Sequence, residues 1–299
     1  MVHVPVLLNE TVDALGVRRG GRYVDGTLGR GGHTKEIIAR GALVLGIDRD
    51  EQAVEEVGKL PGLVVARGNH GDLRRIANEN GWHEVDGILL DLGVSSPQLD
   101  DAGRGFSFQR EGPLDMRMDR SRGLTAAELV NGEDEEGLAR IFHELGEEPR
   151  SRQVARAICR ERTTSRFETT KQLADFIERT IGRRGAHHPA TRVFQALRMA
   201  VNDEIGELES ALTEGLELLK VGGRFAVITF ESLTDRIVKR CFAAHVGKMR
   251  SLQQGGEEWV GELPRVTPVT RKAVVAGEEE TRRNPRARSA KLRAVERTA

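Results

Sequence analysis

The chain has few of the residues that stabilise secreted or membrane-embedded proteins. Only two cysteines occur in 299 residues, Cys159 and Cys241, and they lie far apart, so we expect neither a disulfide framework nor a metal site and interpret both as core residues. No apolar run approaches the ~20 residues that span a bilayer. No secretory leader is recognisable in MVHVPVLLNE. These absences predict a soluble, cytoplasmic protein without a membrane partner.

The chain also lacks net charge, since 46 basic residues balance 46 acidic ones. The charge is nevertheless uneven, because residues 281–299 carry seven Lys and Arg residues against the single acid Glu296. This basic tail is open to two interpretations. It either contacts RNA phosphates or is a solvated charge run.

Short apolar runs alternate with helical patterns along the chain. The runs lie at 22–24, 42–47, 63–66, 87–90 and 224–229. Helical patterns between the first four predict an α/β fold with a doubly wound parallel sheet. The long gap before the last run indicates an insertion. We place it at 104–206, within a discontinuous domain formed by 1–103 and 207–299, and expect edge strands within 266–275.

The insertion has the pattern of an all-helical domain. Thr125 with Glu128, and Thr169 with Gln172, match the spacing of capping boxes at helix starts. Residues 203–220 are expected to form the helix that returns to the last strand. Two apolar stripes with helical spacing are interpreted as core; their members are Leu173, Phe176, Ile177 and Ile181, and Phe194, Leu197, Val201, Ile205 and Leu208.

The most informative motif is the loop Asp25–His33, DGTLGRGGH. It follows the first predicted strand and precedes a helical pattern, which is the context in which glycine-rich loops bind ligands. Asp48 closes the next strand, where a carboxylate can accept hydrogen bonds from ribose hydroxyls. Asp25 would repel a pyrophosphate but attract the ammonium and sulfonium groups of S-adenosylmethionine. The loop therefore favours a methyltransferase over a dehydrogenase that binds NAD.

A second group of polar residues follows the fourth predicted strand. Asp91 ends this strand, and Ser95 and Ser96 follow it at the sheet edge where ligands of such folds bind. Each also has a structural interpretation. Asp91 can cap a helix, and the serines with Pro97 can form a plain turn.

Several long blocks resemble the bacterial 16S rRNA (cytosine N(4))-methyltransferase family. They are HVPVLLNE at 3–10, DGTLGRGGH at 25–33, DGILLDLGVSSPQLD at 86–100, RGFSFQREGPLDMRMD at 104–119, HPATRVFQALRMAVNDE at 188–204 and NPRARSAKLRA at 284–294. The resemblance implies a class I methyltransferase fold with an inserted helical domain. It implies that the substrate is a decoding-centre cytosine, at position 1402 of 16S rRNA within the small ribosomal subunit.

The resemblance also implies contacts to S-adenosylmethionine. These would come from Gly31, Gly32, His33, Asp48, Asp91 and Gln98, together with the residue after Asn69. The family usually has Phe at that last position, whereas this chain has His70. A second departure is VITFESLTDR at 227–236, where the family pattern is close to SFHSLEDR. Glu231 and Thr234 replace His and Glu there, so the role of the family's His is not carried over, but Glu231 follows the fifth strand at the same sheet edge and is kept as a candidate substrate-binding residue.

The same resemblance suggests how a base would be held. Candidate acceptors for the cytosine amino group are Asp91, Ser95, Ser96 and Asp115. Phe106 and Phe108 could stack on an extruded base, or belong to a core. Four arginines could hold phosphates or ribose, or pair with neighbouring acids, namely Arg104, Arg117, Arg192 and Arg198.

The insertion and the basic tail would then face the RNA. No metal is expected. Two alternatives stay open at this point: a methyltransferase with another acceptor, and a non-catalytic RNA-binding assembly factor that retains the fold.

Overall fold

The computed structural model describes residues 5–183, 185, 188–252, 256–260 and 265–299. The chain divides into two compact units, one formed by 1–93 with 206–299 and the other by 94–205. The sequence placed the start of the insertion at 104, later than the second unit begins. Val94 and Leu99 account for the difference, because both pack against the apolar core of the second unit.

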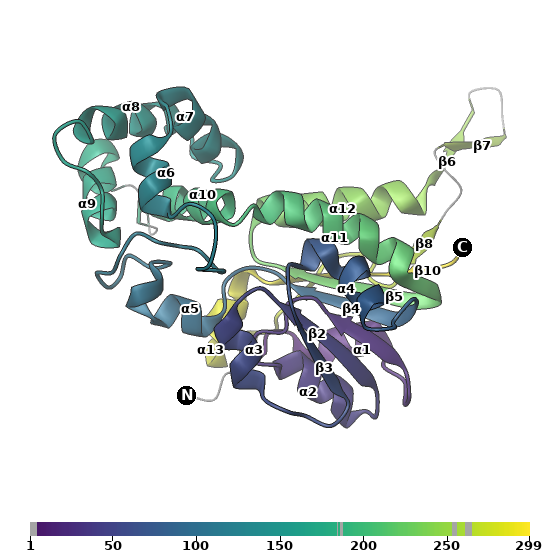
Figure 1. The fold of residues 1–299 in the computed structure, drawn as a ribbon. Coiled ribbons are helices and arrows are strands. Elements are labelled where there is room, and N and C mark those ends of the chain that lie inside the picture. The colour runs from purple at the N-terminus through teal and green to yellow at the C-terminus, as the bar shows by residue number, and fades with distance from the viewer. Residues whose placement is uncertain (1–4, 184, 186–187, 253–255, 261–264) are drawn as a thin grey trace. The chain divides into compact units, whose positions relative to one another are not determined.

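The first unit is built on a sheet with five parallel strands. These are β1 (Arg22–Asp25), β2 (Leu43–Asp48), β3 (Leu63–Arg67), β4 (Val85–Asp91) and β5 (Leu219–Thr229), in the order β3-β2-β1-β4-β5 (Figure 1). They confirm the predicted doubly wound sheet. The fifth strand begins five residues before its prediction at 224, and its register with β4 shifts between Val85 and Gly87.

Helices cover both faces of this sheet. One face packs against α4 (Leu73–Glu79), α11 (Glu204–Leu218) and α12 (Ser232–Val246). The other face packs against α1 (Leu8–Leu15) and α2 (Gly32–Ala39). The remaining elements of this unit are α3 (Glu51–Val57), η1 (His70–Asp72), β6 (Lys248–Ser251), β7 (Glu257–Val260), α13 (Glu278–Arg283) and η3 (Pro285–Ser289).

Residues 291–297 complete the sheet, so the interpretation of the basic tail as a solvated charge run was wrong for this part of it. Strand β10 (Lys291–Arg297) pairs antiparallel with β5, and β8 (Val266–Pro268) and β9 (Val274–Val275) pair with β10 as the predicted edge strands. Leu292 and Val295 are buried in the core. The basic side chains are also engaged, because Arg293 pairs with Asp235 and Arg297 donates to main-chain carbonyls of β5 and α11.

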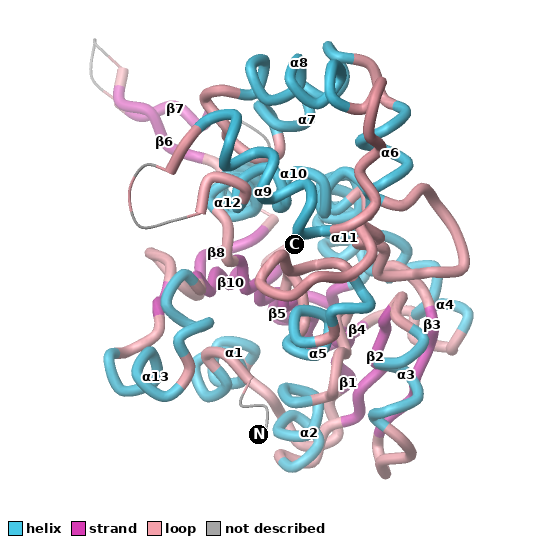
Figure 2. Tube along the Cα trace, turned by 90° about the vertical axis from the view of Figure 1, so that its left-hand side faces the viewer, coloured by secondary structure: helices cyan, strands magenta, loops and turns pink. Residues whose placement is uncertain are grey.

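The second unit is built from helices around its own core (Figure 2). They are α5 (Ser96–Asp100), η2 (Ala102–Arg104), α6 (Ala126–Gly132), α7 (Glu135–Glu144), α8 (Ser151–Glu161), α9 (Thr170–Ile181) and α10 (Thr191–Val201). The capping box at Thr125 and Glu128 is confirmed. At Thr169 only half of it forms, because the Gln172 side chain accepts from Glu168 N–H instead.

Two further findings concern the apolar residues. Both cysteines are half-buried at the margins of the cores rather than inside them. Across the part of the chain that the structure describes, no helix is long and apolar enough to cross a bilayer.

Candidate functional site

Three carboxylates meet at one edge of the sheet of the first unit. Asp25 ends β1, Asp48 ends β2 and Asp91 ends β4. The three strands are parallel, and β1 lies between the other two. Their carboxyl ends therefore bring the three residues together at the edge where doubly wound folds bind ligands.

Asp25 holds the glycine-rich loop closed. Its buried carboxylate accepts hydrogen bonds from the Thr34 hydroxyl (2.7 Å) and from Thr27 N–H (3.2 Å). Burial raises the pKa of Asp25, and the hydrogen bonds only partly offset this effect. Thr27 and Thr34 were not singled out in the sequence, although both are hydroxyl residues beside the loop glycines.

Asp48 fixes the other end of the loop. Its Oδ2 accepts from Gly29 N–H (2.8 Å) and its Oδ1 from Asp50 N–H (2.9 Å). Gly29 and Gly31 adopt left-handed backbone conformations, with φ of 49° and 68°, which glycine tolerates best. Each carboxylate oxygen has a second lone pair, so Asp48 retains the capacity to accept a ribose hydroxyl.

Asp91 differs from the other two carboxylates. Its N–H donates to the Thr27 hydroxyl (2.6 Å), and its Oδ2 lies 3.7 Å from Nδ1 of His33. Its Oδ1 is buried and has no hydrogen-bond partner among the described residues. Burial raises the pKa of Asp91 to about 6, nearby His33 opposes the rise and Asp25 adds to it. A buried oxygen without a partner is costly, so this atom is poised for a donor on a ligand.

His33 is held between Asp91 and the N-terminal segment. Its Nε2 lies 3.0 Å from the carbonyl oxygen of Val6, so this nitrogen carries the hydrogen and donates it. Pro5 packs on the same loop, where a Cβ added to Gly32 would collide with the proline ring. Both nitrogens of His33 therefore face groups of the protein.

His70, at the start of η1, is a neutral aromatic ring beside the loop. It is buried, and its Nε2 lacks a hydrogen-bond partner within the described ranges. Burial lowers the pKa of His70 to about 3, with a further contribution from Arg49. A Cβ added to Gly26 would come within 3.3 Å of the His70 Cβ, which shows how closely His70 approaches the loop. An uncharged ring fits the adenine-stacking position suggested by the sequence.

The two departures from the family pattern after β5 are neighbours in the structure. Glu231 is the N-cap residue of α12, and its carbonyl accepts hydrogen bonds from the Thr234 hydroxyl and from Asp235 N–H, both at 3.1 Å. Thr234 is buried, so it serves the start of this helix.

The remaining candidates lie in the second unit. Ser95 and Gln98 form the capping box of α5, and Ser96 is the first residue of that helix, so these residues begin a short helix rather than a plain turn. Asp115 is buried and accepts from Arg117 Nε (2.7 Å). Burial opposes ionisation there, but the hydrogen bonds from Arg117 prevail and lower the pKa of Asp115.

The aromatic and basic candidates of this unit are mostly engaged within it. Phe106 is buried in the core, and the half-buried Phe108 ring lies 4.7 Å from the His188 ring and 4.8 Å from the Phe194 ring. Arg198 is buried in a bidentate pair with Glu204, at 2.8 and 2.9 Å.

Two more arginines of the second unit contact main-chain carbonyls. Arg104 is buried and donates to Met118 O (2.9 Å), whereas Arg192 is exposed and donates to Glu147 O (3.0 Å). Arg192 is thus the more accessible of these two to a substrate.

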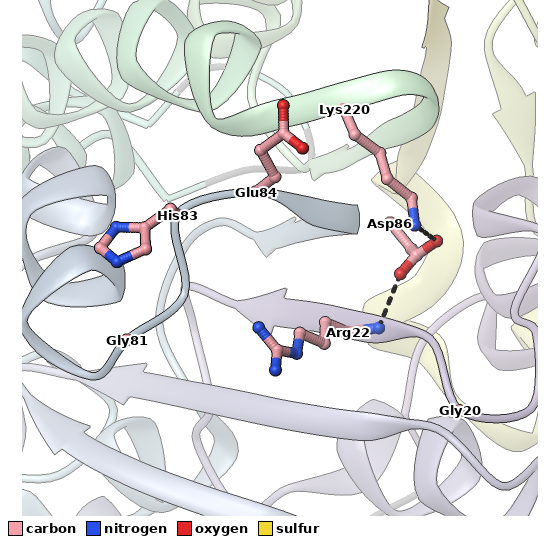
Figure 3. Close-up of a pocket in the computed structure, with 7 residues that line it drawn as sticks. All are labelled: Gly20, Arg22, Gly81, His83, Glu84, Asp86 and Lys220. Atoms are coloured by element: carbon pink, nitrogen blue, oxygen red, sulfur yellow. Dashed lines mark hydrogen bonds and ion pairs between the residues drawn. The ribbon is translucent and has the colours of Figure 1, made fainter.

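A separate hollow of about 420 Å³ lies at the opposite edge of the sheet (Figure 3). It is lined by residues that begin strands, including Arg22, Asp86 and Lys220, and Asp86 accepts from Arg22 N–H and from Lys220. Because the glycine loop and the three carboxylates lie at the other strand ends, this hollow is not the predicted cofactor site. Among the described residues, no three His, Cys, Asp or Glu side chains are grouped to hold a metal.

The match to a protein family decides whether this edge of the sheet belongs to a methyltransferase or to a dehydrogenase. The model of the MraW methylase family matches residues 1–298. The chain belongs to this family. Proteins named ribosomal RNA small subunit methyltransferase H are similar over nearly the whole chain. The one from Deinococcus radiodurans is 49% identical, covering 99% of this chain and 90% of its own, and the one from Carboxydothermus hydrogenoformans is 46% identical, covering 98% and 97%.

Solved structures give a more distant likeness. An rRNA methylase from Streptococcus thermophilus is 11% identical with a TM-score of 0.44, covering 100% of this chain and 99% of its own. Membership in the MraW methylase family confirms the prediction of an S-adenosylmethionine-dependent methyltransferase. The residues of the first unit fit this donor, because Asp48 can still accept a ribose hydroxyl and the buried His70, whose Nε2 lacks a partner in the described chain, lies beside a loop shaped by glycines.

Proposed function

We propose that this MraW-family methylase transfers a methyl group from S-adenosylmethionine to the exocyclic N4 amino group of the cytosine at position 1402 of 16S rRNA, in the small ribosomal subunit. The observation that carries the proposal is the similarity to ribosomal RNA small subunit methyltransferase H proteins at 46–49% identity over 98–99% of the chain. The blocks at 86–119 and 188–204, which resemble the cytosine N(4) family, support the choice of acceptor.

Asp91 is the residue best suited to act on the amino group. S-adenosylmethionine, when bound, supplies a methyl group on a positively charged sulfur. The cytosine amino nitrogen is a poor nucleophile because its lone pair is delocalised into the ring. Asp91 Oδ1, which lacks a partner among the described residues, would accept a hydrogen bond from this amino group and localise the lone pair. The methylated amino group would carry one proton too many, and the Asp91 carboxylate or water would accept it.

The pKa of Asp91 suits this role. At about 6 it leaves the carboxylate ionised at neutral pH, yet makes it a stronger proton acceptor than an ordinary aspartate. Asp25 and Asp48 are less suited to accept the proton, because donors of this chain already occupy them. We assign these two to holding the loop and the ribose.

The second unit is proposed to hold the RNA. In this proposal the exposed Arg192 and the half-buried Phe108 contact the substrate directly. Phe106, Asp115, Arg117 and Arg198 maintain the unit from within, and Ser95, Ser96 and Gln98 form the capped start of α5. Glu231 lies at the same sheet edge as Asp91, since Asp91 ends β4 and Glu231 follows the parallel neighbouring strand β5.

The decisive experiment transfers radiolabelled methyl groups to small subunits from cells that lack this gene, followed by nucleoside analysis of the 16S rRNA. We expect N4-methylcytidine at position 1402, and none with Asp91→Ala. Label in another nucleoside would assign a different acceptor. Tight binding to subunits without any transfer would instead favour the non-catalytic assembly factor.

A further inference from the structure

One face of α8 in the second unit carries three arginines spaced one helical turn apart. Arg152, Arg156 and Arg160 are all exposed. The opposite face of the helix buries Val154, Ala155 and Ile158 in the core. The stripe is not conspicuous in the sequence, because the surrounding insertion has nearly as many acidic as basic residues and the local excess is averaged out.

These arginines form few ion pairs with the residues that the structure describes. Arg156 Nε lies 3.2 Å from Glu135 Oε1, but both side chains are about half exposed, at 59% and 44%, and such surface pairs exchange easily. Arg152 and Arg160 form no ion pair with any residue that the structure describes. By contrast, Arg198 of the same unit is held by a buried carboxylate.

The spacing of the stripe costs stability in isolation. Like charges four residues apart on a helix repel each other, by a few tenths of a kcal/mol per pair. From Arg152 to Arg160 the stripe extends eight residues, roughly 12 Å at the helical rise of ~1.5 Å per residue. The only acid between 150 and 166 is Glu161. A row of negative charges over a similar length would relieve this repulsion.

We propose that Arg152, Arg156 and Arg160 on α8 form a surface that contacts the phosphate backbone of RNA. This proposal rests on the proposed function for the identity of that RNA, as ribosomal RNA. The guanidinium fork matches phosphate geometry, and contacts of this kind position a protein without reading sequence. The surface belongs to the second unit, and none of its residues belongs to the cofactor loop.

The neighbouring side chains favour RNA over a lipid surface. A helix that lies on a membrane presents large apolar residues next to its basic ones. On α8 and just beyond it, the exposed neighbours of the arginines are polar, namely Gln153, Thr163 and Thr164. The apolar side chains of the helix are used in the core instead.

The test compares two triple variants with the same loss of charge. The first is Arg152→Gln, Arg156→Gln and Arg160→Gln. The control is Arg122→Gln, Arg179→Gln and Arg183→Gln, which changes exposed arginines of the same unit outside α8. Glutamine is nearly as good a helix former as arginine, so both should fold, which circular dichroism and S-adenosylhomocysteine affinity check.

Affinity for 16S rRNA and for small subunits is then measured between 50 and 200 mM salt. For the α8 variant we expect the slope of log affinity against log salt to fall by about 2 to 3, since each phosphate contact contributes about 0.7 to 0.9. The control should keep the wild-type slope, and KM for subunits should rise in the α8 variant with little change in kcat. Equal slopes in all three proteins would overturn the proposal.

Two other outcomes are informative. Weaker binding to intact subunits with unchanged binding to naked rRNA would assign the surface to an acidic ribosomal protein and reject the RNA contact. Because the slope requires no methyl transfer, it also separates this proposal from the proposed function. If N4-methylcytidine is not formed but the slopes still differ, the acceptor is wrong and the RNA surface stands.

Discussion

Asp91 differs from Asp25 and Asp48 in its hydrogen-bond partners within the protein. Three aspartates end neighbouring strands, and their sequence context does not distinguish them. In the structure, hydroxyl and backbone donors occupy the first two, whereas Asp91 Oδ1 is buried without a partner in the described chain. Natural proteins accept such a cost mainly at functional sites. The sequence could place Asp91 at the sheet edge, but only the hydrogen-bond geometry makes it the best candidate base.

Asp91→Asn should abolish methyl transfer and raise the free energy of unfolding above neutral pH. The pKa of Asp91 is about 6 in the folded state against 3.8 for the free residue, so the native state binds more protons between these values. The free energy of unfolding of the wild type therefore falls as pH rises from about 4 to about 6, by at most about 3 kcal/mol for this roughly two-unit shift. Asparagine cannot titrate, so the variant should lack this fall and be more stable at pH 8, with methyl transfer lost.

Urea titrations from pH 4 to pH 8 measure this difference. The matched control is Asp72→Asn, an exposed aspartate paired with Arg75 at the start of α4. The wild-type kcat/KM should also decline below about pH 6 as Asp91 becomes protonated. Parallel stability curves for wild type and Asp91→Asn would show that this carboxylate does not carry the raised pKa.

His70 illustrates a substitution that preserves a physical property. The family usually places Phe at this position, and a histidine would normally change charge near neutral pH. Here burial holds the pKa of His70 at about 3, so the ring remains neutral and aromatic under working conditions. The side chain changes while an uncharged ring beside the loop is retained.

Among the elements, the five parallel strands were predictable and the antiparallel strand β10 was not. The strands β1 to β5 are apolar runs bounded by turns, and their burial makes the pattern visible. Strand β10 reads KLRAVER, in which the inward-facing Leu292 and Ala294 alternate with Lys291 and Arg293. Those two basic residues pair with Asp235 of α12, more than fifty residues earlier in the chain. No local sequence pattern predicts that pairing, so the sequence of β10 has the appearance of a basic tail.

Asp235→Ala should destabilise the first unit. Burial opposes ionisation of Asp235, but hydrogen bonds from Arg293 and Lys291 prevail and lower its pKa. Its contribution is therefore present above the pKa of a free aspartate and is lost as pH falls below it. At pH 7, removing the carboxylate leaves the largely buried Arg293 without its partner, which costs about 3 kcal/mol.

Thermal unfolding at pH 7 tests this expectation, with Glu279→Ala as control. Glu279 pairs with Arg283 on the exposed surface of α13, so its loss should leave the midpoint unchanged. If both variants behave alike, β10 is not held by Asp235. A truncation that removes residues 282–299 would not test RNA binding by the tail, because it also deletes strand β10 from the sheet.

At the scale of the whole molecule, the chain forms two units with separate cores. The core of the second unit draws all its members from 94–205, including helices α6 to α10. The buried pair of Arg198 and Glu204 and the hydrogen bonds of Asn202 to Met116 and Met118 also lie within it. A unit with its own core and its own buried polar partners has what independent folding requires.

A fragment spanning 94–205 should therefore fold alone, with a helical circular dichroism spectrum and a cooperative urea transition. A matched fragment spanning 104–206, cut at the boundary expected from sequence, lacks Val94, Leu99 and α5. Since Val94 and Leu99 pack against the core, we expect the shorter fragment to be less stable by about 1–3 kcal/mol, visible as a lower urea midpoint. Neither fragment should bind S-adenosylmethionine in calorimetry, because Asp25, Asp48 and Asp91 lie outside both. Equal midpoints would place the start of the unit at 104, and a non-cooperative transition in both would show that this core depends on the rest of the chain.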